Sequence, residues 1–433
     1  MEKKLAELAA ELVARAKPGW DYLTLRATCD SGFTGHRVTS GSAEEDPRIR
    51  RLDSLVALGA DGQVVVEMRI EPDGAFTALL TEGIHQQDGL LPPTYSLVFE
   101  PRPRHLIPPY ERTEVTSTGP LAAVEAELGV PLPAEVHELY RSGVTEFGDH
   151  TLLPADEILT VRRERLDDEA SFFAHRYGAW AEPIPYTGPR DAVQLVGFHP
   201  LWVPIVRYPS GVTLCVDLAP GPRGRVGQVI LASLNCQPLE LLAESVTEWH
   251  RSPEHPDHPG MRAHYYAEDY DLDVVAEVSR RFQTLRELGL YDLGDADLAP
   301  LASLSDLRDL KVSGGRLRLG GLADLPLERL HVTATEADVP ALERLTSLTV
   351  SGGARVDLPE LPRLRVLDVS GADVDVESLP QVDHLTLNAE QWRRCTVRPA
   401  AATLVGERSL AQALDWAESL GVVLPRRVVS GRP

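Results

Sequence analysis

The chain has 433 residues, of which 43% are hydrophobic and 25% charged, and its formal net charge is −22. This length predicts two to four domains, and the composition lets each bury a core. The acidic excess argues against nucleic-acid binding through phosphates, because Lys and Arg supply most of that affinity. No stretch approaches about eighteen uncharged apolar residues, so we expect no membrane span. Because Glu2 and Glu7 interrupt the would-be apolar N-terminus, we expect no signal peptide.

The cysteine pattern points to a reducing compartment. Cys29, Cys215, Cys236 and Cys395 lie far apart and form no CxxC pair, which argues against a zinc site and against a disulfide framework. Cys215 falls inside a predicted strand and is interpreted as a small buried hydrophobic residue. We therefore expect a cytoplasmic protein without a metal or other cofactor.

Residues 1–105 are predicted to form a small α+β domain. Leucines at helical spacing predict an amphipathic helix over 2–17, and alternation predicts a strand over 20–27. Three further strands, two of them entered through Asp-Gly turns, are predicted over 52–58, 63–70 and 75–80. The helix, the entry Pro18-Gly19-Trp20 and these turns resemble the YezG-like immunity family. The alternative is an unclassified α+β domain, and in either case a proline-rich linker follows.

Three short apolar runs separated by Pro- and Gly-rich turns predict an antiparallel sheet in mid-chain, over 202–208, 212–218 and 227–231. The motifs are Trp202-Val203-Pro204-Ile205, Gly211, Asp217-Leu218-Ala219-Pro220-Gly221 and Gly227-Gln228-Val229-Ile230. With an expected helix and turn over 124–135 and an expected closing helix over 241–249, they resemble the SUKH superfamily of Smi/Knr-type proteins. We therefore expect an α+β domain of this type over 111–252.

The SUKH resemblance implies a protein partner, because bacterial members are largely immunity proteins that neutralise a toxin. Residues 111–250 hold 20 acidic and 10 basic side chains, which would steer a basic partner such as a nuclease toxin. The alternative is that the charge serves solubility alone. The expected contact residues are Asp217, Arg223 and Arg225 on the sheet and its loops, and Glu164, Asp167, Asp168 and Glu169 in an acidic cluster.

Aromatic residues follow the acidic cluster, namely Phe172, Phe173, Tyr177 and Trp180. They would either anchor a partner on an exposed insertion or complete a core under an amphipathic helix, and we favour the core. Residues 251–270 are expected to be an extended, proline-rich linker. Its His255 and His258 are not expected to hold a metal, because metal ligands need rigid supports.

From Leu285 onward the pattern LxxLxL occurs six times, with starts separated by 22, 20, 18, 19 and 18 residues. The pattern resembles leucine-rich repeats, whose units bury their leucines by stacking on neighbours. We expect a short solenoid over 270–433, closed by a capping helix over 409–420. The residues between the leucines form a polar concave stripe, suited to protein recognition or merely solvated. The candidate binding residues there are Lys311, Arg329, His331, Asp368 and His384.

No familiar catalytic motif occurs: GxSxG, HExxH, a Walker loop and GxGxxG after a strand are all missing. We therefore predict a non-catalytic binding protein, and specifically an immunity protein that covers the active site of a basic toxin. Two alternatives stay open. One is an adaptor or regulatory scaffold that binds a protein through its repeats, and the other is an uncharacterised enzyme in the N-terminal domain.

Overall fold

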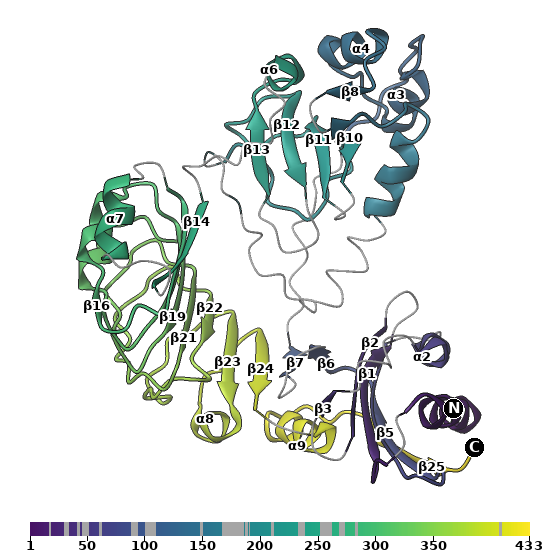
Figure 1. Cartoon of the computed structure of the whole chain (residues 1–433), viewed down its shortest axis with the longest axis vertical. Helices are drawn as coiled ribbons and strands as arrows, with labels where there is room; N and C mark the ends of the chain where they lie inside the picture. The colour runs from purple at the N-terminus through teal and green to yellow at the C-terminus, as the bar shows by residue number, and fades with distance from the viewer. Residues whose placement is uncertain are drawn as a thin grey trace. The chain divides into compact units, whose positions relative to one another are not determined.

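The computed structural model shows a mixed α/β protein with several sheets (Figure 1). It describes residues 1–16, 19–29, 34–40, 44–45, 52–59, 63–87, 94–99, 110–147, 150–166, 186, 189, 191–208, 212–232, 239–251, 262–267, 273–281, 285–406 and 409–433. The chain divides into two compact units. Unit 1 holds residues 1–101, 292–299 and 311–433, and unit 2 holds 102–291 and 300–310.

The N-terminal part of unit 1 is a sheet covered by two helices. The strands lie in the order β25-β5-β4-β1-β2-β3. Their bounds are Arg427–Gly431 for β25, Phe76–Thr81 for β5, Val64–Ile70 for β4, Leu23–Cys29 for β1, Thr34–Ser40 for β2 and Glu44–Glu45 for β3. Helix α1 (Glu2–Arg15) packs the leucines at positions 5, 8 and 12 against this sheet, as the helical spacing predicted.

Residues 52–58 differ from the predicted strand. The segment forms helix α2 (Asp53–Leu58), which packs beside α1. Leu52, Leu55 and Leu58 are buried three residues apart, a helical rather than an alternating period. The predicted strand was wrong because a short apolar run fits either a strand or a helix, and the buried leucines here follow the helical period.

The C-terminal part of unit 1 contains parallel strands that come from successive LxxLxL units. They are β17 (Asp309–Ser313), β19 (Arg329–Thr333), β21 (Ser347–Ser351), β22 (Val366–Asp368), β23 (His384–Asn388) and β24 (Ala401–Val405). Equivalent apolar positions pair in register, since Leu330 aligns with Leu348, Leu348 with Leu367 and Leu367 with Leu385. All four leucines are buried, so successive sequence repeats place equivalent residues in the same layer of the core.

Short elements complete these units. A second small parallel sheet consists of β16 (Ala296–Asp297), β18 (Arg316–Arg318) and β20 (Glu336–Asp338). The turns between strands include the 3-10 helices η3 (Ala299–Ser303) and η4 (Gly320–Leu322). Helix α8 (Ala389–Arg394) begins with a capping box in which Asn388 and Gln391 bond reciprocally. Helix α9 (Leu410–Ser419) lies where the last helix was predicted and is capped by Ser409.

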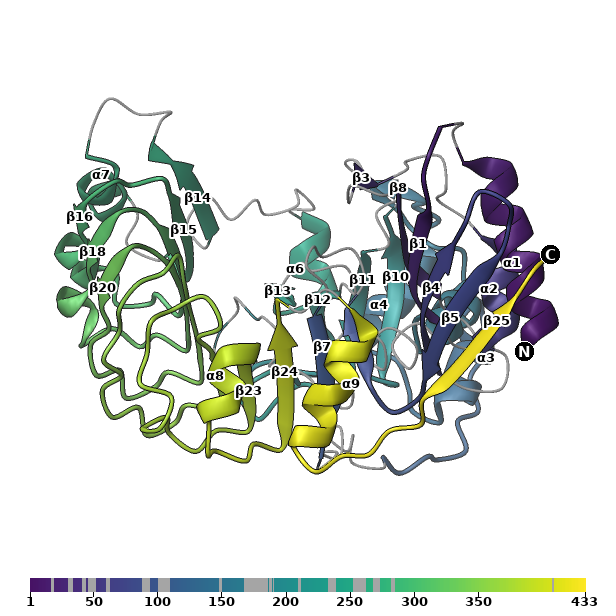
Figure 2. The same ribbon diagram turned by 90° about the horizontal axis from the view of Figure 1, so that it is seen from below.

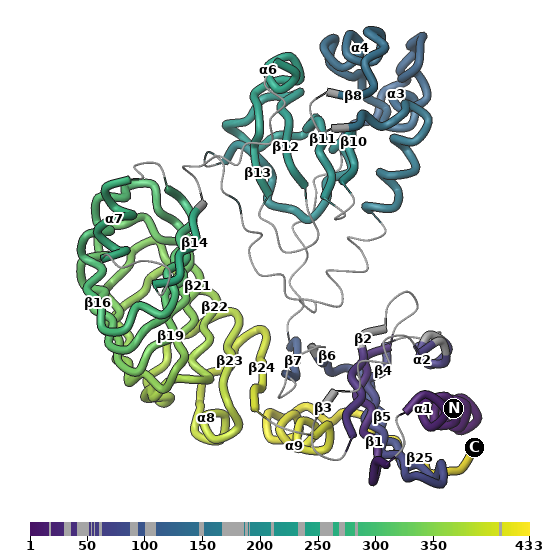
Figure 3. Tube along the Cα trace, in the orientation of Figure 1, coloured from purple at the N-terminus to yellow at the C-terminus, as the bar shows by residue number. Residues whose placement is uncertain are grey.

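The two ends of the chain exchange strands within unit 1 (Figure 3). The hairpin β6 (His85–Gln87) and β7 (Thr94–Val98) continues the repeat sheet, because β7 pairs antiparallel with β24 from Thr94–Val405 to Val98–Ala401. Conversely, β25 pairs antiparallel with β5. The N-terminal block and the repeats thus share one compact unit. Long-range strand pairing leaves no local signal, so sequence alone did not reveal it.

Most of unit 2 is an α+β domain. Helices α3 (Ala122–Leu128), α4 (Ala134–Arg141) and a helix over 158–166 pack on a sheet of order β10-β11-β12-β13. The strands are β10 (Trp202–Arg207), β11 (Thr213–Asp217), β12 (Gln228–Ala232) and β13 (Glu240–Ala243). A two-stranded ribbon, β8 (Glu146–Phe147) with β9 (His150–Thr151), precedes the third helix. The first three strands of the sheet match the predicted ones closely.

The predicted closing helix over 241–249 is shorter than expected. Its first half is β13, in which Ala243 pairs with Val229 of β12, and only α6 (Val246–Arg251) is helical. Both faces of the sheet are buried: Val203, Leu214 and Val216 lie in one core, while Trp202, Cys215 and Ile230 lie in another. Continuous apolar strands follow from this two-sided burial.

The remainder of unit 2 includes β14 (Arg262–Tyr266), helix α7 (Val274–Arg281) and β15 (Glu287–Tyr291). Strands β14 and β15 pair in parallel (Figure 2). His264 lies opposite Gly289 and Tyr266 opposite Tyr291. Residues 252–261, half of the linker predicted over 251–270 with its His255 and His258, lie outside the described residues, whereas 262–266 form β14 where an extended linker was expected.

Candidate protein-binding surfaces

The loop between β11 and β12 is held by a fully buried carboxylate–amide pair. Asp217 accepts hydrogen bonds from the Ala219 backbone N–H and from Gln228 Nε2, each at 2.8 Å. Gln228 Oε1 in turn accepts from the backbone N–H of Arg225 at 3.0 Å, and its Nε2 also donates to the carbonyl of Ala192 at 2.9 Å. One side-chain pair thereby fixes both ends of the loop.

Asp217 lies inside the domain, which corrects its expected role as a contact residue. Its side chain is fully buried, and this burial raises its pKa to about 6 despite the hydrogen bonds from Gln228 and Ala219. A group without exposed surface offers nothing to a partner. Asp217 instead shapes the loop that carries Arg223 and Arg225, both of which are exposed.

Two glycines let this loop lie directly against residues 191–194. The backbone N–H of Gly221 donates to Ala192 at 3.0 Å, and that of Arg223 donates to Asp191 at 2.9 Å. A Cβ on Gly221 would lie 2.3 Å from the Asp191 carbonyl oxygen, and one on Gly224 would lie 1.9 Å from that of Ala192. Only glycine allows such a close backbone approach.

The tip of the loop, defined here as residues 223–226, is largely exposed. Val226 is 66% exposed, although it is apolar. Arg225 Nη1 lies 2.8 Å from Glu244 Oε2, and both side chains of this ion pair are largely exposed. An exposed apolar residue such as Val226 beside an exposed ion pair, whose charges could pair with a partner instead, suits a protein contact.

The acidic cluster expected at 164–169 is described only at its first residue. Glu164 is half-exposed on the helix over 158–166 and forms an ion pair with Arg207 of β10 at 3.0 Å. Asp167, Asp168 and Glu169 lie outside the described residues, as do the aromatic residues at 172–180.

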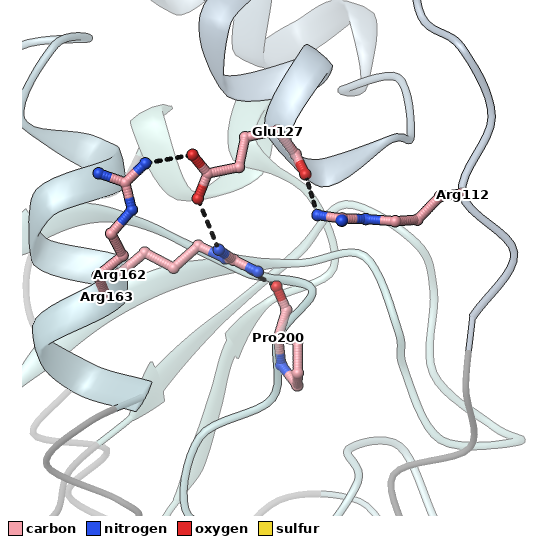
Figure 4. Close-up of polar contacts among 5 residues, drawn as sticks. All are labelled: Arg112, Glu127, Arg162, Arg163 and Pro200. Carbon is pink, nitrogen blue, oxygen red and sulfur yellow. Dashed lines mark hydrogen bonds and ion pairs between the residues drawn. The ribbon is translucent and has the colours of Figure 1, made fainter.

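An ionic network around buried Arg162, which sequence reasoning missed, holds the third helix in place (Figure 4). Glu127 of α3 forms ion pairs with Arg162, at 3.4 Å, and with Arg163. Arg162 is buried and donates from Nε to the carbonyl of Pro200 at 2.8 Å, while Arg112 donates to the Glu127 carbonyl. Burial lowers the pKa of Arg162, so its partners compensate for the charge being taken from water.

Further buried polar groups support the same domain. Glu125 of α3 accepts from the backbone N–H of Leu132 at 2.7 Å and contacts His137 at 3.0 Å, and it thereby shapes the turn between α3 and α4. His199 is buried, and burial together with nearby Arg162 lowers its pKa to about 4. Its Nδ1 accepts from the Leu201 backbone N–H at 3.0 Å. Sequence offered no signal for these roles, because each depends on spatial neighbours.

The polar stripe of the repeats lies on the alternate positions that the pattern predicted. Along β19 and β21 the leucines and valines are buried, while Arg329, His331 and Thr333 and their neighbours on β21 are at least partly exposed. Lys311 of β17 is also partly exposed. Lys311, Arg329 and His331 therefore lie at least partly exposed on one sheet face.

Two other residues of the stripe, which are also partly exposed, have their side chains bonded to neighbours in the protein. His384 Nε2 lies 2.7 Å from Thr403 Oγ1, and Thr403 Oγ1 lies 2.8 Å from Ser96 Oγ, so a polar row links β23, β24 and β7. Burial lowers the pKa of His384 to about 4. Asp368 accepts from Ser370 Oγ at 2.7 Å, and burial raises its pKa. The hydrogen bonds of both side chains therefore help to hold the strands and turns of the sheet together.

The residues that the structure describes contain no candidate metal site. Among them, no group of three or more His, Cys, Asp or Glu side chains is placed to hold a metal ion. Cys215 is fully buried, and burial raises the pKa of its thiol, which fits a packing role. The described helices include none long and apolar enough to cross a membrane.

Comparison with known proteins places the sheet domain in a family. Residues 117–252 match the SMI1 / KNR4 family (SUKH-1). The cell wall biosynthesis/cell cycle regulator smi1 of Schizosaccharomyces pombe is 51% identical over 124 residues, 25% of this chain and 24% of that protein. The cell wall assembly regulator SMI1 of Saccharomyces cerevisiae is 38% identical over 61 residues, 14% of this chain and 12% of that protein.

A shorter match is to the glucan synthesis regulatory protein of Neurospora crassa, 54% identical over 43 residues, 10% of this chain and 8% of that protein. The chain thus spans a quarter or less of each of these relatives. The expected SUKH domain in mid-chain is confirmed. The relatives are named as fungal regulators, so they lend the bacterial immunity role no support.

Proposed function

We propose that this protein, whose residues 117–252 match the SMI1/KNR4 (SUKH-1) family, is a non-catalytic, protein-binding regulator. The family match carries the proposal, since the matched relatives are named as regulators. The absence of familiar catalytic motifs from the sequence agrees with a binding role. The spacing of the cysteines favours the cytoplasm as its place of action.

The partner that we infer is a basic protein domain. Residues 111–250 carry twice as many acidic as basic side chains, 20 against 10, which favours a cationic surface opposite them. The contact surface would include the loop tip at 223–226 and the ion pairs Arg225–Glu244 and Arg207–Glu164. An immunity role, in which the basic domain is a toxin covered at its active site, is the specific form suggested by the SUKH resemblance.

A second candidate is a scaffold role for the repeats. We propose that residues 270–433 are a leucine-rich-repeat solenoid, which the in-register pairing of equivalent leucines supports. Its binding face would then carry Lys311, Arg329 and His331. This candidate predicts that partner capture depends on the repeats and is insensitive to charges in residues 111–250.

Capture of partners from native lysate by the full chain separates the two candidates. We expect a basic partner that is released as salt rises and that is lost with Glu164→Lys and Glu244→Lys. Glu336→Lys is the matched control, because Glu336 also forms an exposed ion pair, with Arg316 at 2.6 Å. Loss of capture only with Lys311→Glu or Arg329→Glu would replace the first candidate by the scaffold. The whole chain is used because truncation would remove β24 or β25 from unit 1.

A further inference from the structure

Strands β14 and β15 of unit 2 lie side by side (Figure 2) and carry a cluster of rings. His264 and Tyr266 alternate along β14, and Glu287, Gly289 and Tyr291 alternate along β15, so all five lie on the same side of the pair. Strand β14 is the first strand in its sheet order. We call these five residues the ring cluster.

The rings are stacked rather than packed edge to face. The ring centroids of Tyr266 and Tyr291 are 4.9 Å apart with an interplanar angle of 28°, and those of His264 and Tyr291 are 6.0 Å apart at 7°. His264 Nδ1 also lies 3.2 Å from the Tyr291 hydroxyl oxygen. Tyr266 is nevertheless 48% exposed, so a large part of this aromatic surface faces solvent.

Gly289 makes room for this arrangement. A Cβ at that position would lie 2.3 Å from His264 Nδ1 and 2.7 Å from the Tyr291 hydroxyl oxygen. Both side chains therefore lie over the backbone of Gly289, which no larger residue would permit. The stack is a consequence of the local sequence and is not a loose surface contact.

Carboxylates lie beside the rings. Glu287 is buried, and its Oε1 lies 3.5 Å from His264 Nε2. Asp309 is also buried. Burial raises the pKa of Tyr291, and the charges of Tyr266, Glu287 and Asp309 raise it further. An exposed aromatic face next to negative charge attracts cations through the ring quadrupole and through Coulomb forces.

We propose that the ring cluster binds an arginine side chain of a protein partner, with the guanidinium stacked on Tyr266. A planar guanidinium suits stacking better than an ammonium group does. The protein already contains such a contact, because the Arg69 guanidinium lies 3.8 Å from the ring centroid of Tyr22. The site rests on the proposed protein-binding function, since its arginine belongs to the partner, and it adds a second point of contact to that function.

The test uses the full chain with ¹³C-labelled tyrosine rings, titrated with the amide of Gly-Arg-Gly and followed by NMR. We expect saturable shifts of the Tyr266 and Tyr291 signals. The matched peptide Gly-citrulline-Gly has the same shape without the charge and should bind at least about 3-fold more weakly. Equal shifts with both peptides would overturn the proposal.

Variants separate the site from general surface effects. Tyr266→Leu should weaken the arginine peptide about 2- to 5-fold, with Tyr291 signals showing that the strands remain folded. Glu287→Gln should weaken the arginine peptide without changing the citrulline peptide. Tyr22→Leu is the control and should have no effect, because Arg69 already covers that ring. Unchanged affinity in Tyr266→Leu would refute the site.

The outcome is independent of the capture experiment. If the peptide binds but no protein partner is captured from lysate, the proposed function fails and the arginine site stands. If a partner is captured and its binding survives Tyr266→Leu while the peptide does not bind, the function stands and the ring cluster has no part in it.

Discussion

His199 and Asp217 show how two buried residues of one domain titrate in opposite senses. Burial and Arg162 lower the His199 pKa from 6.5 to about 4, so acidification between these values protonates the unfolded chain first and destabilises the fold. Burial raises the Asp217 pKa from 3.8 to about 6, so acidification in that window protonates the folded state first and stabilises it. The two effects partly cancel in the native protein.

Single substitutions should therefore reveal opposite pH slopes. Asn in place of His199 keeps an acceptor for the Leu201 N–H but cannot titrate. Compared with the native protein, the change in the free energy of unfolding from pH 6 to pH 4 should be more positive by on the order of 2 kcal/mol in His199→Asn, because the destabilising protonation of His199 in the unfolded chain is removed. In Asp217→Asn that change should be more negative by a similar amount. Urea unfolding at several pH values measures both, and parallel slopes in the two variants would disprove the assignment.

The ion pair of Glu127 with buried Arg162 makes a second residue-scale prediction. Glu127→Gln keeps the volume and one acceptor oxygen but removes the negative charge opposite buried Arg162. We expect a loss of about 1–2 kcal/mol in the free energy of unfolding of unit 2. Glu336→Gln, at the exposed pair with Arg316, should leave stability unchanged within error. Equal effects of the two substitutions would show that the network around buried Arg162 has no special weight.

Local sequence pattern was sufficient to predict those elements whose local preference agrees with their long-range pairing. Strands β10, β11 and β12 are continuous apolar runs bounded by Pro and Gly, and the same residues pair in the structure. Helix α2 could also have been predicted, because its leucines at 52, 55 and 58 follow a helical period. The spacing of these three leucines is therefore a local signal for the helix.

Other elements and the site needed information from distant residues. Residues 240–243 form β13 only because β12 offers a pairing edge, which overrides the helical pattern of 241–249. The motif containing Asp217 could be recognised from sequence, but its complete burial under the loop at 219–227 could not. On this loop, Arg223 and Arg225 are the predicted site residues that remain exposed to a partner.

The loop between β11 and β12 provides an element-scale prediction. In Gly224→Ala the new Cβ would lie 1.9 Å from the Ala192 carbonyl oxygen, so the loop must move away from residues 191–194. We expect a loss of about 2–3 kcal/mol and faster amide exchange over 219–227. Gly320→Ala is the control, because its Cβ would meet only Asp338 Oδ2 at an ordinary 3.6 Å. Equal amide exchange over 219–227 in the two variants would contradict the packing argument.

At the scale of the whole molecule, the strand exchange makes the two ends of the chain depend on each other. Strand β7 extends the repeat sheet through β24, and β25 extends the N-terminal sheet through β5. Side chains reinforce both junctions: Ser96 meets Thr403 at 2.8 Å, and Thr77 meets Ser430 at 3.2 Å. Unit 1 should consequently unfold as one cooperative body and not as two sequential domains.

Val429 of β25 tests this dependence. It packs against the N-terminal core and pairs with Ala78, whereas nearby Val423 is 83% exposed. Val429→Asp places a charge against apolar residues and should lower the free energy of unfolding by about 1–3 kcal/mol, while Val423→Asp should be neutral. Amide exchange measured by mass spectrometry should accelerate in β4 and β5 and, because the sheets are coupled, also in β24. If β4 and β5 loosened while β24 kept its protection, the N-terminal block and the repeats would be separate folding units after all.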